Sequence, residues 1–374
     1  MARHSDEIGS ENEPVWEETE EVQYEEPAAI DEAAYAEAAM QQATDEDMEA
    51  LEVLRNGYGA IKQELAKVIV GQEDVIDQVL MAIFTKNHAL LVGVPGLAKT
   101  LLISTLAQTL HLSFKRVQFT PDLMPSDITG TEIMATNPET GERNFRFMHG
   151  PIFANIVLAD EINRTPPKTQ AALLEAMQER QVTVGGTVHK LPSPFFVLAT
   201  QNPLDQEGTY TLPEAQLDRF MFLINVDYPD TDEEIEIMKR ASSPSSEEVH
   251  AILDEETILQ LQKTVKRVPV ADHVFSYAEK IVRMTRASKD LSIKDDWARK
   301  YLGWGAGPRA SISLIAAAKA YALLHGNFYV SCDDVAAVAL PVMRHRISPN
   351  FQAQSEGITS ESLIEHILKT VPRA

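Results

Sequence analysis

A glycine-rich loop that ends in Lys-Thr constrains the fold of this chain more than any other segment. The loop reads Gly93-Val94-Pro95-Gly96-Leu97-Ala98-Lys99-Thr100, between an apolar run at 89–92 and a helical stretch that continues through Leu101. In a strand–loop–helix unit of this kind, backbone N–H groups and the helix N-terminus face phosphate oxygens, the lysine bridges the phosphates and the threonine hydroxyl ligates Mg²⁺. The segment therefore predicts a phosphate-binding loop in an α/β core.

The residue before the lysine departs from the usual pattern, because Ala98 stands where a glycine is common. Alanine is suited to a helix-compatible backbone, so we expect the loop to have entered the helix already at this position. Taken alone, the relaxed pattern would arise by chance in about one in a hundred chains of this length. The flanking strand and helix make the interpretation far stronger than the pattern alone.

Short apolar runs alternate with helical segments through the middle of the chain. We expect strands at 89–92, 114–119, 156–159, 195–199 and 220–226. With helices at 99–110 and 169–180 between them, they predict a mainly parallel five-stranded sheet covered by helices on both faces. Two hairpins are expected outside this repeat, at 131–148 with the turn Asn137 to Gly141, and at 181–191 around Gly185-Gly186.

Charge and composition divide the chain into three predicted parts. Residues 1–50 hold 17 acidic residues and one basic residue, and so supply −16 of the net charge of −23. We expect a disordered acidic extension at 1–45, an α/β core with the phosphate-binding loop and the two hairpins at 46–230 and a helical lid domain at 231–374, the last because strand signals fade after Pro229.

Several classes of protein are excluded by the same composition. An acidic chain is a poor candidate for a protein that mainly neutralises phosphates along a nucleic acid. The single cysteine, Cys332, excludes an intramolecular disulfide and is expected to be structural. No apolar run is long enough to cross a membrane and no secretory signal opens the chain, so we expect a cytoplasmic protein without membrane insertion.

Polar side chains follow two of the predicted strands. Asp160 and Glu161 come directly after the strand at 156–159, where an α/β sheet places its ligands. Asp160 would hold Mg²⁺ through water and Glu161 would polarise an attacking water, whereas the alternative is two acids in an ordinary loop. Asn202 follows the strand at 195–199 and could contact a γ-phosphate, but taken in isolation the residue is better explained by an Asn-Pro turn.

Together these segments resemble an AAA+ ATPase. More narrowly, the motifs Gly-x-Pro-Gly-x-Ala-Lys-Thr, Ala-Asp-Glu-Ile-Asn-Arg, Ala-Thr-Gln-Asn-Pro and Leu-Pro-Glu-Ala-Gln-Leu-Asp-Arg-Phe are similar to the MoxR family. The similarity covers about residues 50–370, and within it Ala98 is the family's own variant. It implies ATP and Mg²⁺ as ligands, with residues 93–101 around the phosphates and Gly71 and Gln72, in Val-Gly-Gln, at the adenine.

The resemblance also assigns roles to three polar residues. Asn202 corresponds to the sensor 1 position, Arg219 to an arginine finger that reaches a neighbouring subunit's nucleotide, and Arg309 to sensor 2. The alternative for Arg219 is a salt bridge to Asp218 or Glu214. Arg309 follows Pro308 at a helix start, where a cation opposes the helix dipole, so it favours an anion, and the alternative is an exposed arginine.

Two further features have weaker interpretations. The resemblance matches the two hairpins to the helix 2 insert and the pre-sensor 1 insert of the clade that includes chelatase subunits, with their tips lining a central pore. The basic residues at 344–346 are expected to be a solvated helix end, with an interface role as the alternative.

The resemblance implies a homo-oligomeric ring, expected to be a hexamer, that hydrolyses ATP at subunit interfaces to remodel a client protein. It also implies a partner with a von Willebrand factor A domain. One alternative is the motor subunit of a magnesium chelatase, and another is a slow, ATP-switched binding module. A nucleic-acid motor would need a basic pore, for which Arg143 and Lys190 in the hairpins are thin support.

Overall fold

The computed structural model describes residue 35 and residues 43–136, 143–203, 208–242, 247–290, 293 and 295–373. The acidic extension before residue 43, apart from Tyr35, lies outside this part of the chain, as do the predicted hairpin turn at 137–141 and residues 243–246. Among the described residues no helix is both long and apolar enough to cross a membrane.

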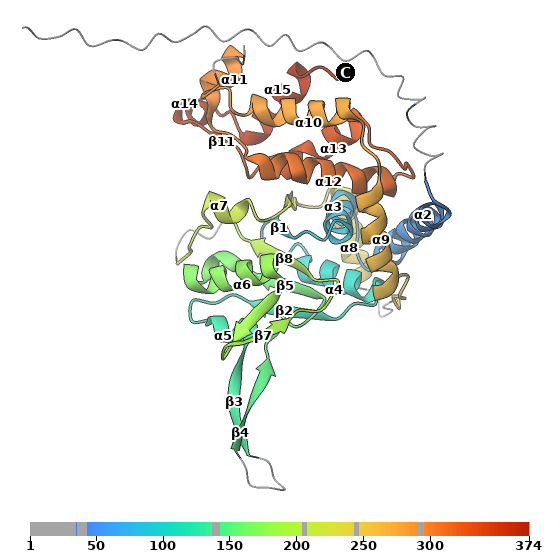
Figure 1. Ribbon diagram of the computed structural model, residues 1–374, viewed down its shortest axis with the longest axis vertical. Helices are drawn as coiled ribbons and strands as arrows, with labels where there is room; N and C mark the ends of the chain where they lie inside the picture. Colours follow the sequence, from blue (N-terminus) through green and yellow to red (C-terminus); the bar gives the residue numbers. More distant parts are fainter. Residues whose placement is uncertain are drawn as a thin grey trace, which may run out of the picture.

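The first half of the chain alternates strands and helices, as Figure 1 shows. Its elements are α2 (Asp45–Ala66), α3 (Glu73–Phe84), β1 (Ala89–Val92), α4 (Lys99–Thr109), β2 (Phe114–Gln118), α5 (Pro125–Thr129), β3 (Gly130–Thr136), β4 (Arg143–His149), β5 (Ile156–Asp160), the short 3-10 helix η1 (Ile162–Arg164), α6 (Pro167–Glu179), β6 (Gln181–Val184), β7 (Thr187–Lys190), β8 (Phe196–Gln201), α7 (Glu214–Leu217) and β9 (Phe222–Asn225).

The second half is mainly helical. Its elements are α8 (Thr231–Ala241), α9 (Glu255–Arg267), α10 (Asp272–Met284), α11 (Asp296–Tyr301), β10 (Leu302–Trp304), α12 (Pro308–Leu324), α13 (Cys332–Met343), β11 (Ser348–Pro349), α14 (Phe351–Ser355) and α15 (Ser360–Thr370). From α10 onwards this half forms the upper part of Figure 1, whereas α8 and α9 lie lower, beside the α/β core. The capping box at Ser331 and Asp334, where the serine hydroxyl accepts the Asp334 N–H at 3.1 Å, starts α13.

In the described part of the chain, five strands form one sheet in the order β2-β5-β8-β1-β9. All neighbours are parallel, which confirms the α/β class. Strand β1 lies between β8 and β9, so the chain order reverses beside it. Ligands of open α/β sheets bind at the carboxyl ends of the strands near such a reversal, and the glycine-rich loop leaves β1 at this point.

Strand β5 shows why the sheet needs helices on both faces. Its side chains alternate between two buried apolar clusters, with Ile156 and Leu158 in one and Val157 and Ala159 in the other. The first cluster continues through α2, α3 and α4 into the helices that follow β9, and the second lies against α5 and α6. A run that is apolar at every position is therefore buried on both sides.

Both predicted hairpins are present. The hairpin β3–β4 projects from the core on the side away from the helical upper part, as Figure 1 shows, and β6–β7 lies at its base. The ring of Phe147 on β4 stacks on that of His189 on β7 with centroids 3.8 Å apart, so the two hairpins are joined by an aromatic contact.

The helical lid contains one feature that the sequence analysis missed. Strands β10 and β11 form a short antiparallel pair, with Leu302 opposite Pro349. Strands of two or three residues carry no measurable alternation of apolar and polar side chains, so the expectation of helices alone needs this addition.

The buried ring of His88 allows the packing of the core to be tested by changing the pH. The ring is buried, and its Nδ1 accepts the Val197 N–H at 3.0 Å while Nε2 lies 3.1 Å from the Met177 carbonyl, which suits the neutral Nε2–H form. Burial lowers the pKa of His88 to about 4, below the value of about 6.5 for an unfolded chain. The neutral His88 ring therefore makes its full contribution to the free energy of unfolding above pH 6.5, and this contribution is lost as the pH falls towards 4.

We expect His88 to make the free energy of unfolding about 3 kcal/mol lower at pH 4 than at pH 7. The measurement is denaturant unfolding across this pH range for wild type and His88→Gln, which keeps a donor and an acceptor but does not titrate. Identical pH dependence in the two proteins would contradict the assignment.

Candidate functional site

The carboxyl ends of β1, β5 and β8 open into a cavity of about 430 Å³. Its lining comes from the glycine-rich loop and from the residues that end β5 and β8. These residues are Pro95, Gly96, Leu97, Ala98, Lys99, Thr100, Leu101, Arg116, Asp160, Glu161, Thr200 and Asn202. Side chains that lie up to about a hundred positions apart in sequence thus meet at one edge of the sheet.

The loop itself lies tightly against β9. A Cβ atom on Gly93 would be 2.8 Å from the Val226 carbonyl oxygen, so only glycine fits there. The ammonium group of Lys99 donates to the carbonyl of Gly93. Burial lowers the pKa of Lys99, an effect that the nearby carboxylates of Asp160 and Glu161 oppose. A phosphate at this position would supply the counter-charge that this half-buried cation favours.

Asp160 is held by two neighbours. Its Oδ1 accepts the Thr200 hydroxyl at 2.6 Å, and its Oδ2 accepts the Arg116 guanidinium through Nη2 at 2.6 Å and Nε at 3.0 Å. Thr200 extends from β8 and Arg116 from β2, the strands on either side of β5. Three adjacent strands therefore fix the orientation of one carboxylate.

Glu161 turns the chain out of the sheet. It has a left-handed backbone with φ 57°, and its N–H donates to the Thr200 hydroxyl at 2.9 Å. The carboxylate accepts the Gln118 amide at 2.6 Å and lies 3.3 Å from Nε of Arg164. A non-glycine residue in this region is strained by about 1–3 kcal/mol, which is typical of functional positions.

The donor set of the cavity fits Mg²⁺. Thr100 and Asp160 both line it, and hydroxyl and carboxylate oxygens are the ligands that this ion prefers. Within the described residues no group of three or more His, Cys, Asp or Glu forms a metal cage. Protein sites for Mg²⁺ usually supply one or two ligands and leave the rest to water and phosphate, so two oxygen donors suffice.

A second cavity of about 530 Å³ adjoins the first. It shares four loop residues with it and also contains Gly71 and Gln72, the linker after β9 and the start of α8. The Gln72 amide donates to the Leu97 carbonyl at 3.3 Å, which connects this segment to the glycine-rich loop. A planar group bound in this second cavity would lie next to phosphates bound on the glycine-rich loop.

Arg219 and Arg309 lie elsewhere, in a separate cavity of about 340 Å³. Among the described residues, five cations and one carboxylate, that of Asp218, line it. The cations are Lys86, Arg180, Arg219, Arg309 and Arg346. Asp218 pairs with Nε of Arg346 at 2.8 Å and with Nη1 of Arg309 at 3.5 Å. Within the described part of the chain the buried Nε of Arg219 has no hydrogen-bond partner, so the cavity favours an anion.

Comparison with known proteins decides the family. Residues 88–222 match the ATPase family associated with various cellular activities (AAA), and residues 295–367 match the AAA lid domain. The chaperone MoxR1 of Mycobacterium tuberculosis is 44% identical over 310 residues, which are 82% of this chain and 80% of that protein. The chain belongs to the MoxR family of AAA+ ATPases.

Other similarities agree with this family. Protein MoxR of Methylorubrum extorquens is 30% identical over 85% of this chain and 95% of its own length. A crystal structure of a protein from Cytophaga hutchinsonii is 43% identical, covers 87% of this chain and 97% of its own, and has a TM-score of 0.80. The MoxR-family fold thus extends over nearly all of the chain outside the acidic extension.

The structure divides the predicted site of this MoxR-family chain in two. It brings the loop, Asp160, Glu161 and Asn202 together, with Gly71 and Gln72 alongside, but it places Arg219 and Arg309 in the other cavity. The alternative salt bridge of Arg219 is absent from the described residues. Asp218 instead binds Arg346 and Arg309, while the Glu214 carboxylate accepts the Ser348 hydroxyl at 2.9 Å.

The expectation for Ala98 was wrong. Helix α4 begins at Lys99, and Ala98 has a left-handed backbone with φ 54° and ψ 20° just before it. The residue therefore adopts the conformation that glycine provides in other loops, at a cost of about 1–2 kcal/mol for a residue with a Cβ atom. The tight turn into the helix requires this backbone whichever residue occupies the position.

The basic cluster at 344–346 is not a solvated helix end. Arg346 and His345 are buried between α13 and the segment before β9. Besides Asp218, Arg346 donates to the carbonyls of Phe220 at 2.7 Å and Met221 at 3.0 Å. The charge pattern alone could not distinguish this buried clamp from an exposed helix end, because burial depends on packing between distant segments.

Three polar residues of the site were missed by the sequence analysis. Arg116 and Gln118 are alternate residues of β2, and Thr200 ends the apolar run of β8. The signal that could have found these three residues is a pair of polar residues at alternate positions of a strand end, beside a strand that ends in two acids.

The substitution Gly71→Ala tests the packing around the second cavity through its effect on the free energy of unfolding. A Cβ atom there would lie 2.0 Å from Oε1 of Glu233, whose Oε2 caps α8 by accepting the Asp230 N–H at 3.0 Å, and φ is 67°. We expect Gly71→Ala to lower the free energy of unfolding by about 2 kcal/mol, through left-handed strain and a lost cap.

Denaturant unfolding of a double-mutant cycle checks this expectation. Because Glu233→Ala removes the clashing carboxylate, Gly71→Ala should cost less in that background than in wild type. Gly59→Ala in α2 is the matched control, since a Cβ atom there meets nothing within 4 Å. Equal costs of Gly71→Ala in both backgrounds would refute the clash.

Proposed function

We propose that this chain hydrolyses ATP with Mg²⁺ at the interfaces between subunits of a homo-oligomeric ring, of six subunits by analogy with its family. The observation that carries the proposal is the separation of the phosphate-binding cavity from the cavity of Arg219 and Arg309. A site completed by a second copy explains why a cation-rich cavity contains a buried Arg219 Nε without a partner. It also gives the exposed Arg309 an anion to contact.

Within one subunit, each residue has a role in this proposal. The glycine-rich loop and Lys99 hold the phosphates, Gly71 and Gln72 border the base, and Thr100 and Asp160 hold Mg²⁺. When bound, the ion neutralises charge on the phosphate oxygens. Glu161 accepts a proton from the attacking water, and Asn202 orients that water or the γ-phosphate.

The neighbouring subunit contributes the two arginines. Arg219 and Arg309 stabilise the charge that develops on the transferring phosphoryl oxygens, which is the largest electrostatic contribution in related P-loop enzymes. Sensor 2 would then act between subunits rather than within one. Support for this arrangement comes from Asp218, which holds both Arg309 and the buried Arg346 next to the finger.

The ring remodels or activates client proteins in a cytoplasmic setting, in keeping with the name of its relative, chaperone MoxR1. The hairpins, as helix 2 and pre-sensor 1 inserts, would face the client. Met134 and Phe145 support this role, because they are paired on β3 and β4 and are exposed by 58% and 70%. A partner with a von Willebrand factor A domain is proposed on the family resemblance alone.

The proposal predicts that activity depends on assembly. We expect the rate of Mg²⁺-dependent phosphate release per subunit to rise with protein concentration, in step with the oligomer mass measured by light scattering. Lys99→Ala should abolish the activity at every concentration. A constant rate per subunit from a species with the mass of a monomer would overturn a site shared between subunits.

A further inference from the structure

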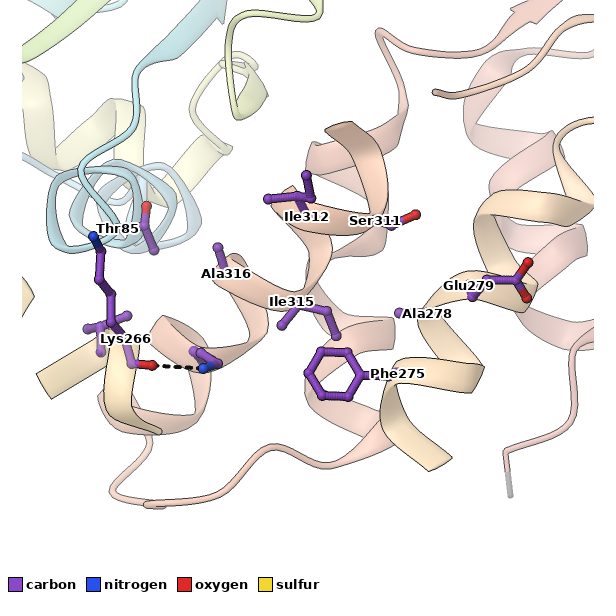
Figure 2. Close-up of a pocket in the computed structure, with 11 residues that line it drawn as sticks. Thr85, Lys266, Phe275, Ala278, Glu279, Ser311, Ile312, Ile315 and Ala316 are labelled. Carbon is purple, nitrogen blue, oxygen red and sulfur yellow. Dashed lines mark hydrogen bonds between the residues drawn. The ribbon is translucent and has the colours of Figure 1, made fainter. Parts of the chain in front are cut away.

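An apolar groove of about 540 Å³ on the lid is separate from the phosphate-binding cavity. Figure 2 shows Ile312, Ile315 and Ala316 of α12 between Phe275 of α10 on one side and Thr85 and Lys266 on the other. Phe275 is 47% exposed and Ile312 is 70% exposed. Large apolar side chains gathered in a groove usually indicate a surface that another segment covers.

Cations surround one end of this groove. Lys266 lines it, and Lys86, which follows the lining residue Thr85, lies close enough to Lys266, Lys263 and Arg180 for their charges to lower its pKa, after burial as the main cause. Among the described residues none of these four side chains forms an ion pair. Of the described residues that line the groove, Glu279 is the only acid. The groove therefore suits an occupant that is both apolar and acidic.

The acidic N-terminal extension enters the folded part beside this groove. Near the start of α2, Asp47 pairs at 2.7 Å with Arg267, the residue after Lys266. Further back, Tyr35 packs against the buried core, and burial together with the charge of Asp272 raises its pKa. Asp272 begins α10, one turn before Phe275. Tyr35 of the extension and Asp47, just after the extension ends, are thus fixed beside two walls of the groove.

We propose that residues 14–26 of this chain occupy the groove. The segment reads Pro-Val-Trp-Glu-Glu-Thr-Glu-Glu-Val-Gln-Tyr-Glu-Glu and combines Trp16, Val22 and Tyr24 with six glutamates and no basic residue. The aromatic rings match the apolar floor, and the glutamates match the cationic end. Tyr35 lies nine positions after Glu26, a span of up to about 30 Å when extended, so the segment is long enough to reach the groove.

This inference does not rest on ATP hydrolysis, and its test uses no nucleotide. A fluorescein-labelled peptide of residues 10–30 is titrated with a chain that lacks residues 1–34 and with the full chain, and anisotropy is measured. We expect the truncated chain to bind at least about tenfold more tightly, because the tethered segment competes in the full chain at millimolar effective concentration. Binding should weaken as salt is raised.

Groove variants of the truncated chain locate the binding surface. Ile312→Glu and Lys266→Glu should each weaken peptide binding by about tenfold or more, which corresponds to about 1.4 kcal/mol. Phe351→Glu, on α14 and 86% exposed, is the matched control and should change nothing. Because Ile312 and Lys266 are exposed, we expect both variants to keep the wild-type circular dichroism and Tm. Weaker peptide binding can then be attributed to the changed groove surface and not to unfolding.

Three outcomes would overturn the proposal. The first is equal peptide affinity in the full and truncated chains, and the second is unchanged affinity in both groove variants. The third is a lower oligomer mass in Ile312→Glu with normal peptide binding, which would assign the groove to a second copy. Helix α8 would then be the occupant to examine, since none of its residues is buried and Ile235 and Met238 are exposed.

Discussion

Arg219→Ala is expected to lower the rate of ATP hydrolysis by about 10³- to 10⁵-fold while leaving ATP binding nearly unchanged. In the proposed function Arg219 acts at a neighbour's site, since it does not line the phosphate-binding cavity of its own chain, so its removal should weaken the transition state there and spare ATP binding. Steady-state phosphate release and equilibrium binding of a fluorescent ATP analogue measure the two quantities. Arg373→Ala, an exposed arginine that pairs with Asp333 on the lid, serves as the control.

Mixing two inactive proteins shows whether Arg219 acts between subunits. Subunits with Arg219→Ala retain Glu161, and subunits with Glu161→Gln retain Arg219, so some mixed interfaces contain both groups. With random assembly at equal amounts, about a quarter of the interfaces are complete, and activity should return to about that fraction of wild type. No recovery, in a mixture shown by mass spectrometry to exchange subunits, would place the finger within its own chain.

Glu161→Gln is expected to lower ATP hydrolysis by about 10²- to 10⁴-fold, because an amide cannot accept the proton of the attacking water. ATP binding should persist, since the loop, Lys99 and Asp160 are unchanged. The same measurements apply, with single-turnover kinetics to separate hydrolysis from product release.

The matched control for this substitution is Glu365→Gln, an exposed glutamate of α15 on the lid, which should retain full activity. If Glu161→Gln hydrolysed ATP at the wild-type rate, another group would be the base and the role given to Glu161 would be wrong. If Glu161→Gln lost both ATP binding and ATP hydrolysis, the Glu161 carboxylate would instead be needed to maintain the structure of the nucleotide site.

The core was predictable because its signals are local. Strand β1 has the predicted bounds, and the other four sheet strands differ from prediction by a few residues at their ends, where pairing with neighbours decides the limit. The motif of Asp160 and Glu161 follows directly from its strand. The wrong predictions concern Arg346, whose burial comes from distant segments, and Ala98, whose backbone is set by the turn into α4. Arg116 was missed because its partner, Asp160, lies on another strand.

By itself the sequence determined the α/β class, the phosphate-binding loop and the acids at the end of β5, because each depends on a few consecutive residues and on strand periodicity. Only the tertiary structure decided that Asp218 binds Arg346 and Arg309 rather than Arg219, and that the two arginines lie apart from the loop. Arg219 is next to Asp218 in sequence and Arg346 is 128 positions away, yet the packing of α13 against the segment before β9 selects Arg346 as a partner.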